Sequence, residues 1–173
     1  MTPRVDAWMR QANSDWAVAE LTAQQGFHSQ ACYHYCQAAE KALKALLISL
    51  GSLPPYSHAL DRLVDSVEAG GVNVSPIRTG RLKALSRMNT ETRYLSDSEA
   101  PADRFDAEDS AQARTAASQA MAFTQASKVG NGSACPTPRL TTRYAALQAP
   151  ARMARPSPSR VAVPASEPVR IPV

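Results

Sequence analysis

The stretch from Ser29 to Leu50, SQACYHYCQAAEKALKALLISL, constrains the fold more than any other part of the sequence. Strong helix formers fill it and neither Gly nor Pro interrupts it, so it predicts a single helix about 33 Å long. Its main apolar residues recur at alternating spacings of four and three, which is the repeat of one helical stripe. They are Cys32, Cys36, Ala39, Leu43, Leu46 and Leu50. We expect this helix to be the central element of a bundle, because a small residue in mid-stripe lets neighbouring helices approach closely.

The opposite side of this helix carries a polar ridge. Its members are Gln30, His34, Gln37, Lys41 and Lys44. Lys41 and Lys44 lie on adjacent turns and could meet phosphate groups together with Gln37. The alternative is that both are ordinary surface lysines, since Glu40 and Lys44 have the spacing of a helical surface ion pair.

A first helix precedes the central one. It is expected to begin near Val5 and to stop near Gly26, a residue suited to a helix C-terminus. Its apolar face is wide and carries Trp8 and Trp16. At this spacing we expect the tryptophans to supply much of the core; the alternative is a platform on which nucleic-acid bases stack.

Three further helical segments follow the break at residues 51–55. Ser57 is expected to cap a third helix, and Ser75-Pro76 to open a fourth, since proline is favoured at the first helical position. Residues 95–105 are acidic and typical of a loop, and residues 106–128 predict an alanine-rich fifth helix. The sequence therefore predicts an all-α, up-and-down bundle of four to five helices.

Charge and proline divide the chain into two parts. Residues 1–129 hold 13 Lys and Arg against 14 Asp and Glu, whereas residues 130–173 hold six Arg, one Glu and eight of the 13 prolines. We expect a near-neutral helical domain over residues 5–128 and a disordered Pro/Arg-rich tail over residues 129–173. The arginines of the tail could hold RNA or another anionic surface; the alternative is a solvated extension.

The composition and the cysteine pattern indicate where the protein works in the cell and whether it binds a metal. The N-terminus lacks the apolar segment of a signal peptide, and no apolar run approaches the ~20 residues of a membrane span. With three cysteines and no disulfide framework, the chain is expected to be cytoplasmic and reduced. His28, Cys32, His34 and Cys36 lie within nine residues, but Cys32 and His34 point about 160° apart around a helix. We therefore expect buried cysteines rather than a metal site.

The order of these features resembles the HEPN family, the "higher eukaryotes and prokaryotes nucleotide-binding" domains. The most specific part is QAAEKALKALL at residues 37–47, followed by Pro54-Pro55, the segment 57–60, and Thr92-Arg93-Tyr94. The resemblance covers roughly residues 5–128. It implies a small helical bundle that forms a homodimer and acts with a minimal nucleotidyltransferase, as a toxin–antitoxin or nucleotide-handling pair.

Some members of that family are metal-independent ribonucleases, whose signature is Arg, four to six residues, then His. After Arg93 the chain has Ser98-Glu99-Ala100 where that histidine should stand. RNA cleavage without a metal needs a base for the 2′-hydroxyl and an acid for the leaving oxygen. No catalytic residue is therefore assigned, and His58, beside the expected Ser57 cap, is expected to be a local structural residue.

The resemblance places the candidate site where the fourth helix enters the next loop. Arg93 would donate to a phosphate, with Tyr94 and Asp97 beside it, near a dimer cleft. Lys41, Lys44 and Gln37 of the polar ridge would complete this phosphate site. The alternative is that Arg93 pairs with a nearby carboxylate and that Tyr94 packs under the loop.

The first function hypothesis is accordingly a nucleotide-binding module that works with a minimal nucleotidyltransferase, without a cofactor or metal of its own. One alternative is a metal-independent endoribonuclease with a non-standard active site. The other is a structural dimerisation module that binds no ligand.

Overall fold

The computed structural model describes residues 2–94 and 98–129, apart from the side chains of residues 80, 128 and 129. Within these ranges the chain forms six α-helices. They are α1 (Pro3–Gln24), α2 (His28–Ser49), α3 (Leu60–Ala69), α4 (Gly80–Glu91), α5 (Pro101–Arg104) and α6 (Ala107–Val129). The all-α prediction is confirmed, whereas the predicted disorder beyond residue 129 concerns residues outside the described ranges.

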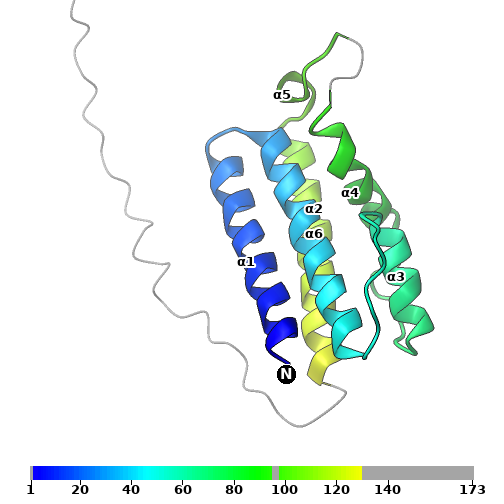
Figure 1. Cartoon of the computed structure of the whole chain (residues 1–173). Coiled ribbons are helices and arrows are strands. Elements are labelled where there is room, and N and C mark those ends of the chain that lie inside the picture. The colour runs from blue at the N-terminus through cyan, green and yellow to red at the C-terminus, as the bar shows by residue number, and fades with distance from the viewer. Residues whose placement is uncertain (1, 95–97, 130–173) are drawn as a thin grey trace, which may run out of the picture. The chain divides into compact units, whose positions relative to one another are not determined.

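Helix α2 lies at the centre, as its apolar stripe predicted. Figure 1 shows α1 on one side of α2, α3 and α4 on the other, and α6 alongside α2. Helices α2 and α6 run in the same direction, and α1 and α4 run opposite to them, so the four long elements alternate up and down along the chain. Gly26 makes the tight turn from α1 into α2 with a φ of 82°, a left-handed conformation in which glycine is not strained.

The burial of α2 is broader than one stripe. Fourteen of its 22 residues are buried, and these include Lys44, which the sequence placed on the polar ridge, and Glu40, its expected surface partner. The expectation of a narrow stripe is wrong because neighbours cover α2 on several sides. On the α1 and α6 side, Ala38 and Ala42 form a second small cluster with Ala12 and Met121.

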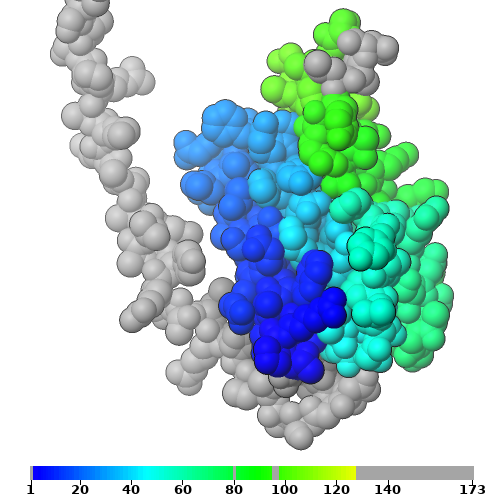
Figure 2. Space-filling model, in the orientation of Figure 1, coloured from blue at the N-terminus to red at the C-terminus, as the bar shows by residue number. Residues whose placement is uncertain are grey.

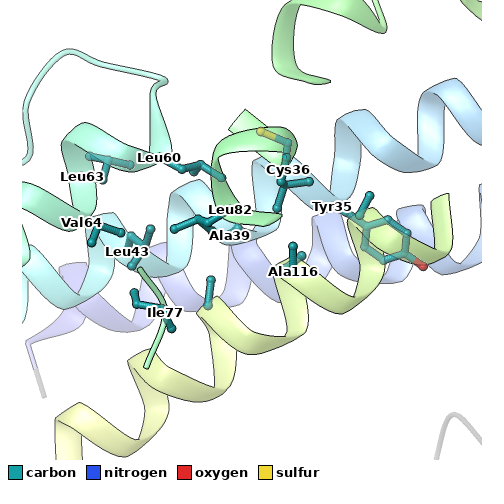
Figure 3. Close-up of a cluster of buried hydrophobic side chains, with 14 of the residues drawn as sticks. Tyr35, Cys36, Ala39, Leu43, Leu60, Leu63, Val64, Ile77, Leu82 and Ala116 are labelled. Atoms are coloured by element: carbon teal, nitrogen blue, oxygen red, sulfur yellow. The ribbon is translucent and has the colours of Figure 1, made fainter. Parts of the chain in front are cut away.

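The main core forms where α2 meets α3 and α4. Leu43 of α2 packs in one cluster with Leu60 and Leu63 of α3 and with Leu82 of α4 (Figure 3). Each of these side chains is almost completely shielded from solvent, and burying one stabilises the fold by about 1.5–3 kcal/mol. Trp8 and Trp16 contribute less than expected, because both remain partly exposed.

Helix α6 packs through small side chains. Ala113, Ala116, Ala117 and Ala120 are all buried, which lets its backbone come close to α2. Asp106 precedes the helix, and its Oδ1 accepts hydrogen bonds from the backbone N–H groups of Glu108 (2.8 Å) and Asp109 (3.0 Å). The predicted fifth helix over residues 106–128 therefore agrees with α6 to within one residue at each end.

Helices α3 and α4 begin later than the sequence predicted. Ser57 Oγ accepts a hydrogen bond from the Ala59 N–H but does not cap α3, which begins at Leu60. The Leu60 N–H donates instead to Ser86 Oγ of α4, a partner that only the tertiary structure supplies. The segment opened by Ser75-Pro76 makes a single turn from Val74 to Arg78, and α4 starts at Gly80.

The segment predicted as a loop over residues 95–105 contains one short helix. This is α5, a single turn with Pro101 at its first position, followed by the buried Phe105. Across residues 2–94 and 98–129, none of the helices combines the length and the apolar character that a membrane crossing requires.

Candidate functional site

A continuous polar network lies where α2 faces α1 and α4. Atoms of α2 reach the surface between α1 and the α3–α4 side of the molecule (Figure 2). Lys41 of α2 donates to Asp15 Oδ2 of α1 at 2.5 Å and to Gln37 Oε1 at 3.1 Å. Both ionised side chains are largely buried, with 19% of Lys41 and 10% of Asp15 exposed. The pair therefore links α1 to α2 in a region where an unpaired charge would be costly.

Glu40, the residue before Lys41 on α2, is the centre of the same network. Its side chain is only 4% exposed, and it accepts hydrogen bonds from Lys44 (2.8 Å) and from Gln37 (3.4 Å). His58 Nδ1 lies 3.1 Å from both carboxylate oxygens, although 70% of the imidazole is exposed. Trp8 of α1 covers Lys44, whose Nζ lies 5.9 Å from the ring centroid. Both carboxylates thus neutralise cations that the sequence assigned to an open ridge.

Arg93 follows α4 and is exposed. Its Nε donates to the backbone carbonyl of Asn89 at 2.8 Å, which satisfies an acceptor that the end of the helix leaves open. The guanidinium lies between two aromatic rings, 5.1 Å from the Tyr33 centroid and 5.4 Å from that of Tyr94, distances at which a cation is attracted to the ring. Within the described part of the chain no carboxylate pairs with Arg93, so its Nη groups can still donate to a ligand.

Hydrogen bonds bring most of the predicted site residues together. Gln37 Nε2 donates to the side-chain oxygen of Asn89 at 3.0 Å, so Gln37 and Lys41 connect to Arg93 through Asn89. Lys44 joins the same network through Glu40. Tyr94 is 61% exposed beside Arg93. The remaining member of the predicted set, Asp97, lies outside the described residues.

The sequence did not identify three members of this region, namely Asp15, Tyr33 and Asn89, and it gave Glu40 only as a surface partner of Lys44. Asp15 offered the clearest signal, because it interrupts the apolar face of α1 between Ala12 and Trp16. Tyr33 and Asn89 acquire their roles only when α2 and α4 pack together. No local pattern in the sequence marks such a contact.

The two cysteines of α2 are buried, as predicted. Burial raises the pKa of the Cys32 thiol and of the Cys36 thiol to about 12 each, and nearby acidic groups add to the effect. The nearby His28 contacts α6: its Nδ1 lies 3.0 Å from Ser110 Oγ. In the ranges that the structure covers, no group of three or more His, Cys, Asp and Glu side chains is arranged to hold a metal ion.

A separate polar contact joins α1, α2 and α6. Tyr35 donates to Glu20 at 2.8 Å, Arg114 Nε donates to the same carboxylate oxygen at 2.6 Å, and Trp16 packs edge-on against Tyr35. Burial alone would raise the pKa of Glu20, but the hydrogen bonds from Arg114 and Tyr35 outweigh it and lower the pKa. Burial and the same Glu20 carboxylate raise the pKa of Tyr35. We interpret this contact as structural, because its donors and acceptors satisfy one another.

A shallow hollow between α4 and α6 is distinct from the polar network. It measures about 180 Å³ and is lined by Arg81, Leu85, Met88 and Gln112, among others. None of the predicted site residues lines it.

Comparison with known proteins agrees with this architecture. The model of the HEPN domain family matches residues 5–128. Two crystal structures share the fold over nearly their whole length. TT1696 from Thermus thermophilus is 22% identical, with a TM-score of 0.61, over 72% of this chain and 98% of that one. ST0689, described as an archaeal HEPN homologue, is 23% identical, with a TM-score of 0.60, over 73% and 99%. No curated protein matches the chain.

Proposed function

The chain belongs to the HEPN domain family, and on that premise we propose that it is a nucleotide-binding module whose phosphate site is centred on Arg93. The guanidinium donates to a phosphate of a nucleotide or of RNA, and the neighbouring tyrosine rings hold it in place. In this proposal the module has no catalytic residue of its own and acts with a minimal nucleotidyltransferase.

One observation carries the proposal: Arg93 is held by the protein without being neutralised by it. The Asn89 carbonyl accepts a hydrogen bond from Nε alone. Tyr33 and Tyr94 contact the guanidinium through their uncharged aromatic rings. A pre-positioned arginine with spare planar donors is suited to phosphate, to which it can donate two parallel hydrogen bonds. The exposed ring of Tyr94 could also stack on a base.

Lys41 and Lys44 support this site less directly than Arg93 does. Each is already paired with a buried carboxylate, Lys41 with Asp15 and Lys44 with Glu40. An ion pair of this kind gives up its cation to an incoming anion only at a cost, because the carboxylate would be left buried and unpaired. We therefore assign the main phosphate contact to Arg93.

Substitution of Arg93 tests the proposal. A fluorescein-labelled single-stranded RNA and a labelled ATP analogue would be titrated with the full-length protein, with fluorescence anisotropy as the readout. We expect Arg93→Ala to weaken binding about tenfold or more, since a hydrogen bond to a charged group is lost. Arg93→Lys should weaken it less, because it keeps the charge but loses the planar pair of donors.

Arg87→Ala is the matched control. Arg87 is an exposed arginine of α4, the helix that Arg93 follows, and it has no ion-pair partner in the described ranges. Arg87→Ala changes the net charge by the same amount as Arg93→Ala. A loss of affinity seen only in Arg93→Ala therefore cannot come from the net charge alone. Equal affinity of the wild type and Arg93→Ala for both probes would refute the proposed site.

The proposed assembly is a homodimer accompanied by a minimal nucleotidyltransferase, and it rests on membership of the family. Light scattering on the purified protein should give twice the chain mass of 18.6 kDa. Co-expression with a minimal nucleotidyltransferase encoded by a neighbouring gene should yield a complex that survives gel filtration. A monomeric mass would contradict the first expectation, and separate elution would contradict the second.

A second candidate, RNA cleavage at a non-standard site, is favoured by the contact between His58 and Glu40. With Nδ1 directed at a buried carboxylate and the ring exposed, Nε2 is left to accept a proton. In the reaction a ribose 2′-oxygen would attack the adjacent phosphorus as His58 takes its proton. The bond to the 5′-oxygen would then break, with water protonating the leaving oxygen.

Incubation of RNA with EDTA and the protein tests this second candidate. We expect cleavage products that end in a cyclic phosphate, lost in His58→Asn and retained in His28→Asn, since His28 contacts Ser110 instead. Cleavage that persists in His58→Asn would contradict this role for His58. If the protein neither binds nucleotide nor cleaves RNA, the remaining hypothesis is a structural dimerisation module that binds no ligand.

A further inference from the structure

Arg93 depends on other residues for its position. An exposed arginine usually samples many rotamers, and ordering it costs conformational entropy when a ligand binds. Here the hydrogen bond from Nε to the Asn89 carbonyl folds the side chain back against α4. The position of the guanidinium is thus tied to the last turn of that helix.

The last turn of α4 is in turn attached to α2 through Asn89. This residue is only 6% exposed, and its side-chain oxygen accepts the hydrogen bond from Gln37 Nε2. Among the described residues, Gln37 is the α2 residue that holds the Asn89 side chain, by this one hydrogen bond. Loss of this bond would leave a buried polar group unsatisfied and loosen the turn that holds Arg93.

Lys41 sets the orientation of the Gln37 side-chain amide. The Gln37 nitrogen faces α4, where it donates to the Asn89 side-chain oxygen. The amide oxygen then faces Lys41, an ammonium that can only donate, and the two atoms are 3.1 Å apart. A flipped amide would place two donors against each other at Lys41 and two acceptors against each other at Asn89. Lys41 keeps this orientation because Asp15 of α1 holds its Nζ.

We propose that Asp15, Lys41, Gln37 and Asn89 form a positioning relay, in which a carboxylate on α1 fixes the arginine that follows α4. This inference rests on the proposed role of Arg93 in phosphate binding. It assigns Gln37 and Lys41 to holding Arg93, in place of the direct ligand contacts that the sequence suggested. It also gives α1 a part in the site, although no α1 side chain contacts Arg93 among the described interactions.

Gln37→Met tests the relay, because methionine has a similar length but neither donates nor accepts as an amide does. Two properties would be measured in the full-length protein. The first is the NMR signal of the Arg93 Nε–H and its exchange with water, without ligand. The second is the affinity for the labelled RNA. We expect faster exchange of the Nε–H and binding about fivefold weaker than in the wild type.

Asp15→Asn is the second variant: its side chain keeps the same shape and one oxygen that can accept from Lys41, but it loses the negative charge. The weaker contact with Lys41 should increase the exchange of the Arg93 Nε–H and lower the affinity for RNA, both by less than Gln37→Met does. Tyr35→Phe is the control: it removes a buried interhelical hydrogen bond to Glu20 of α1 but does not touch the relay. A purely structural effect would appear in all three variants.

Two outcomes are separable. An Arg93 Nε–H signal that is unchanged in both Gln37→Met and Asp15→Asn would overturn the relay, whatever happens to affinity. If instead Arg93→Ala binds RNA and nucleotide as well as the wild type, the proposed function fails. The ligand-free exchange measurement would then decide the relay alone.

Discussion

Arg93 divides its hydrogen-bond donors between the protein and the surroundings, and this division is what distinguishes it from the other cations near α2. Lys41 and Lys44 are paired with buried carboxylates, whereas Arg93 gives only Nε to a carbonyl. The sequence could identify all three as candidate cations, because charge and helical position are local properties. It also gave Glu40 as a partner of Lys44, but it could not identify the partner of Lys41, because Asp15 lies 26 residues earlier and reaches Lys41 only through helix packing.

The cysteines of α2 give a prediction for single residues. Because a thiol with a pKa of about 12 is almost entirely protonated near neutral pH, Cys32 and Cys36 should not react with Ellman's reagent at pH 8 in the folded protein. The measurement uses a Cys135→Ser variant, so that only these two thiols are counted. We expect two equivalents to react in guanidinium chloride; rapid reaction without denaturant would show that α2 is not buried as described.

Thr124 gives a second prediction for a single residue. Its hydroxyl is fully buried in α6 and has no hydrogen-bond partner in the described structure. Valine has nearly the same shape without the polar atom, so Thr124→Val should raise the free energy of unfolding by about 1 kcal/mol, measured in urea. Thr115→Val serves as the control, since Thr115 is exposed on the same helix, and should change stability by less than ~0.5 kcal/mol. A loss of stability in Thr124→Val would show that the hydroxyl is satisfied.

At the scale of helices, how well the sequence predicts an element depends on what determines its ends. The start of α6 could be predicted because Asp106 caps it through local hydrogen bonds. The start of α3 could not, since the Leu60 N–H finds its acceptor on Ser86 of α4. The breadth of burial around α2 was missed for a similar reason: a buried ion pair such as Glu40–Lys44 has the same spacing as an exposed one.

The contact among Glu20, Arg114 and Tyr35 predicts how the packing of α1, α2 and α6 depends on pH. The pKa of Glu20 is lowered from its ordinary value of 4.5, so the ionised carboxylate stabilises the folded state above that value. The stabilisation should disappear as the pH falls through the lower, folded-state pKa. We expect the stability advantage of the wild type over Glu20→Gln to be present at pH 6 and to shrink towards pH 3 in urea titrations. A difference that does not change with pH would contradict this account.

At the scale of the whole molecule, α2 separates an apolar core from a polar network. Its contacts with α3, α4 and α6 bury apolar side chains. The polar network joins it to Asp15 of α1 and to Asn89 of α4, and it holds two buried carboxylates with the lysines that pair with them. Buried ion pairs of this kind often contribute little net stability. Their presence here is explained if the network serves to position Arg93. The sequence predicted the bundle because its periodicity is strong, but it could not predict the network, which exists only between helices.

The most direct test of this account is an NMR titration of the full-length protein with a nucleoside triphosphate, following the Arg93 Nε–H and the ring signals of Tyr33 and Tyr94. The account predicts that these signals shift together and saturate with one dissociation constant, while the Arg87 Nε–H stays in place. It would be contradicted if the ligand shifted other residues but not Arg93, or if no signal moved at millimolar nucleotide.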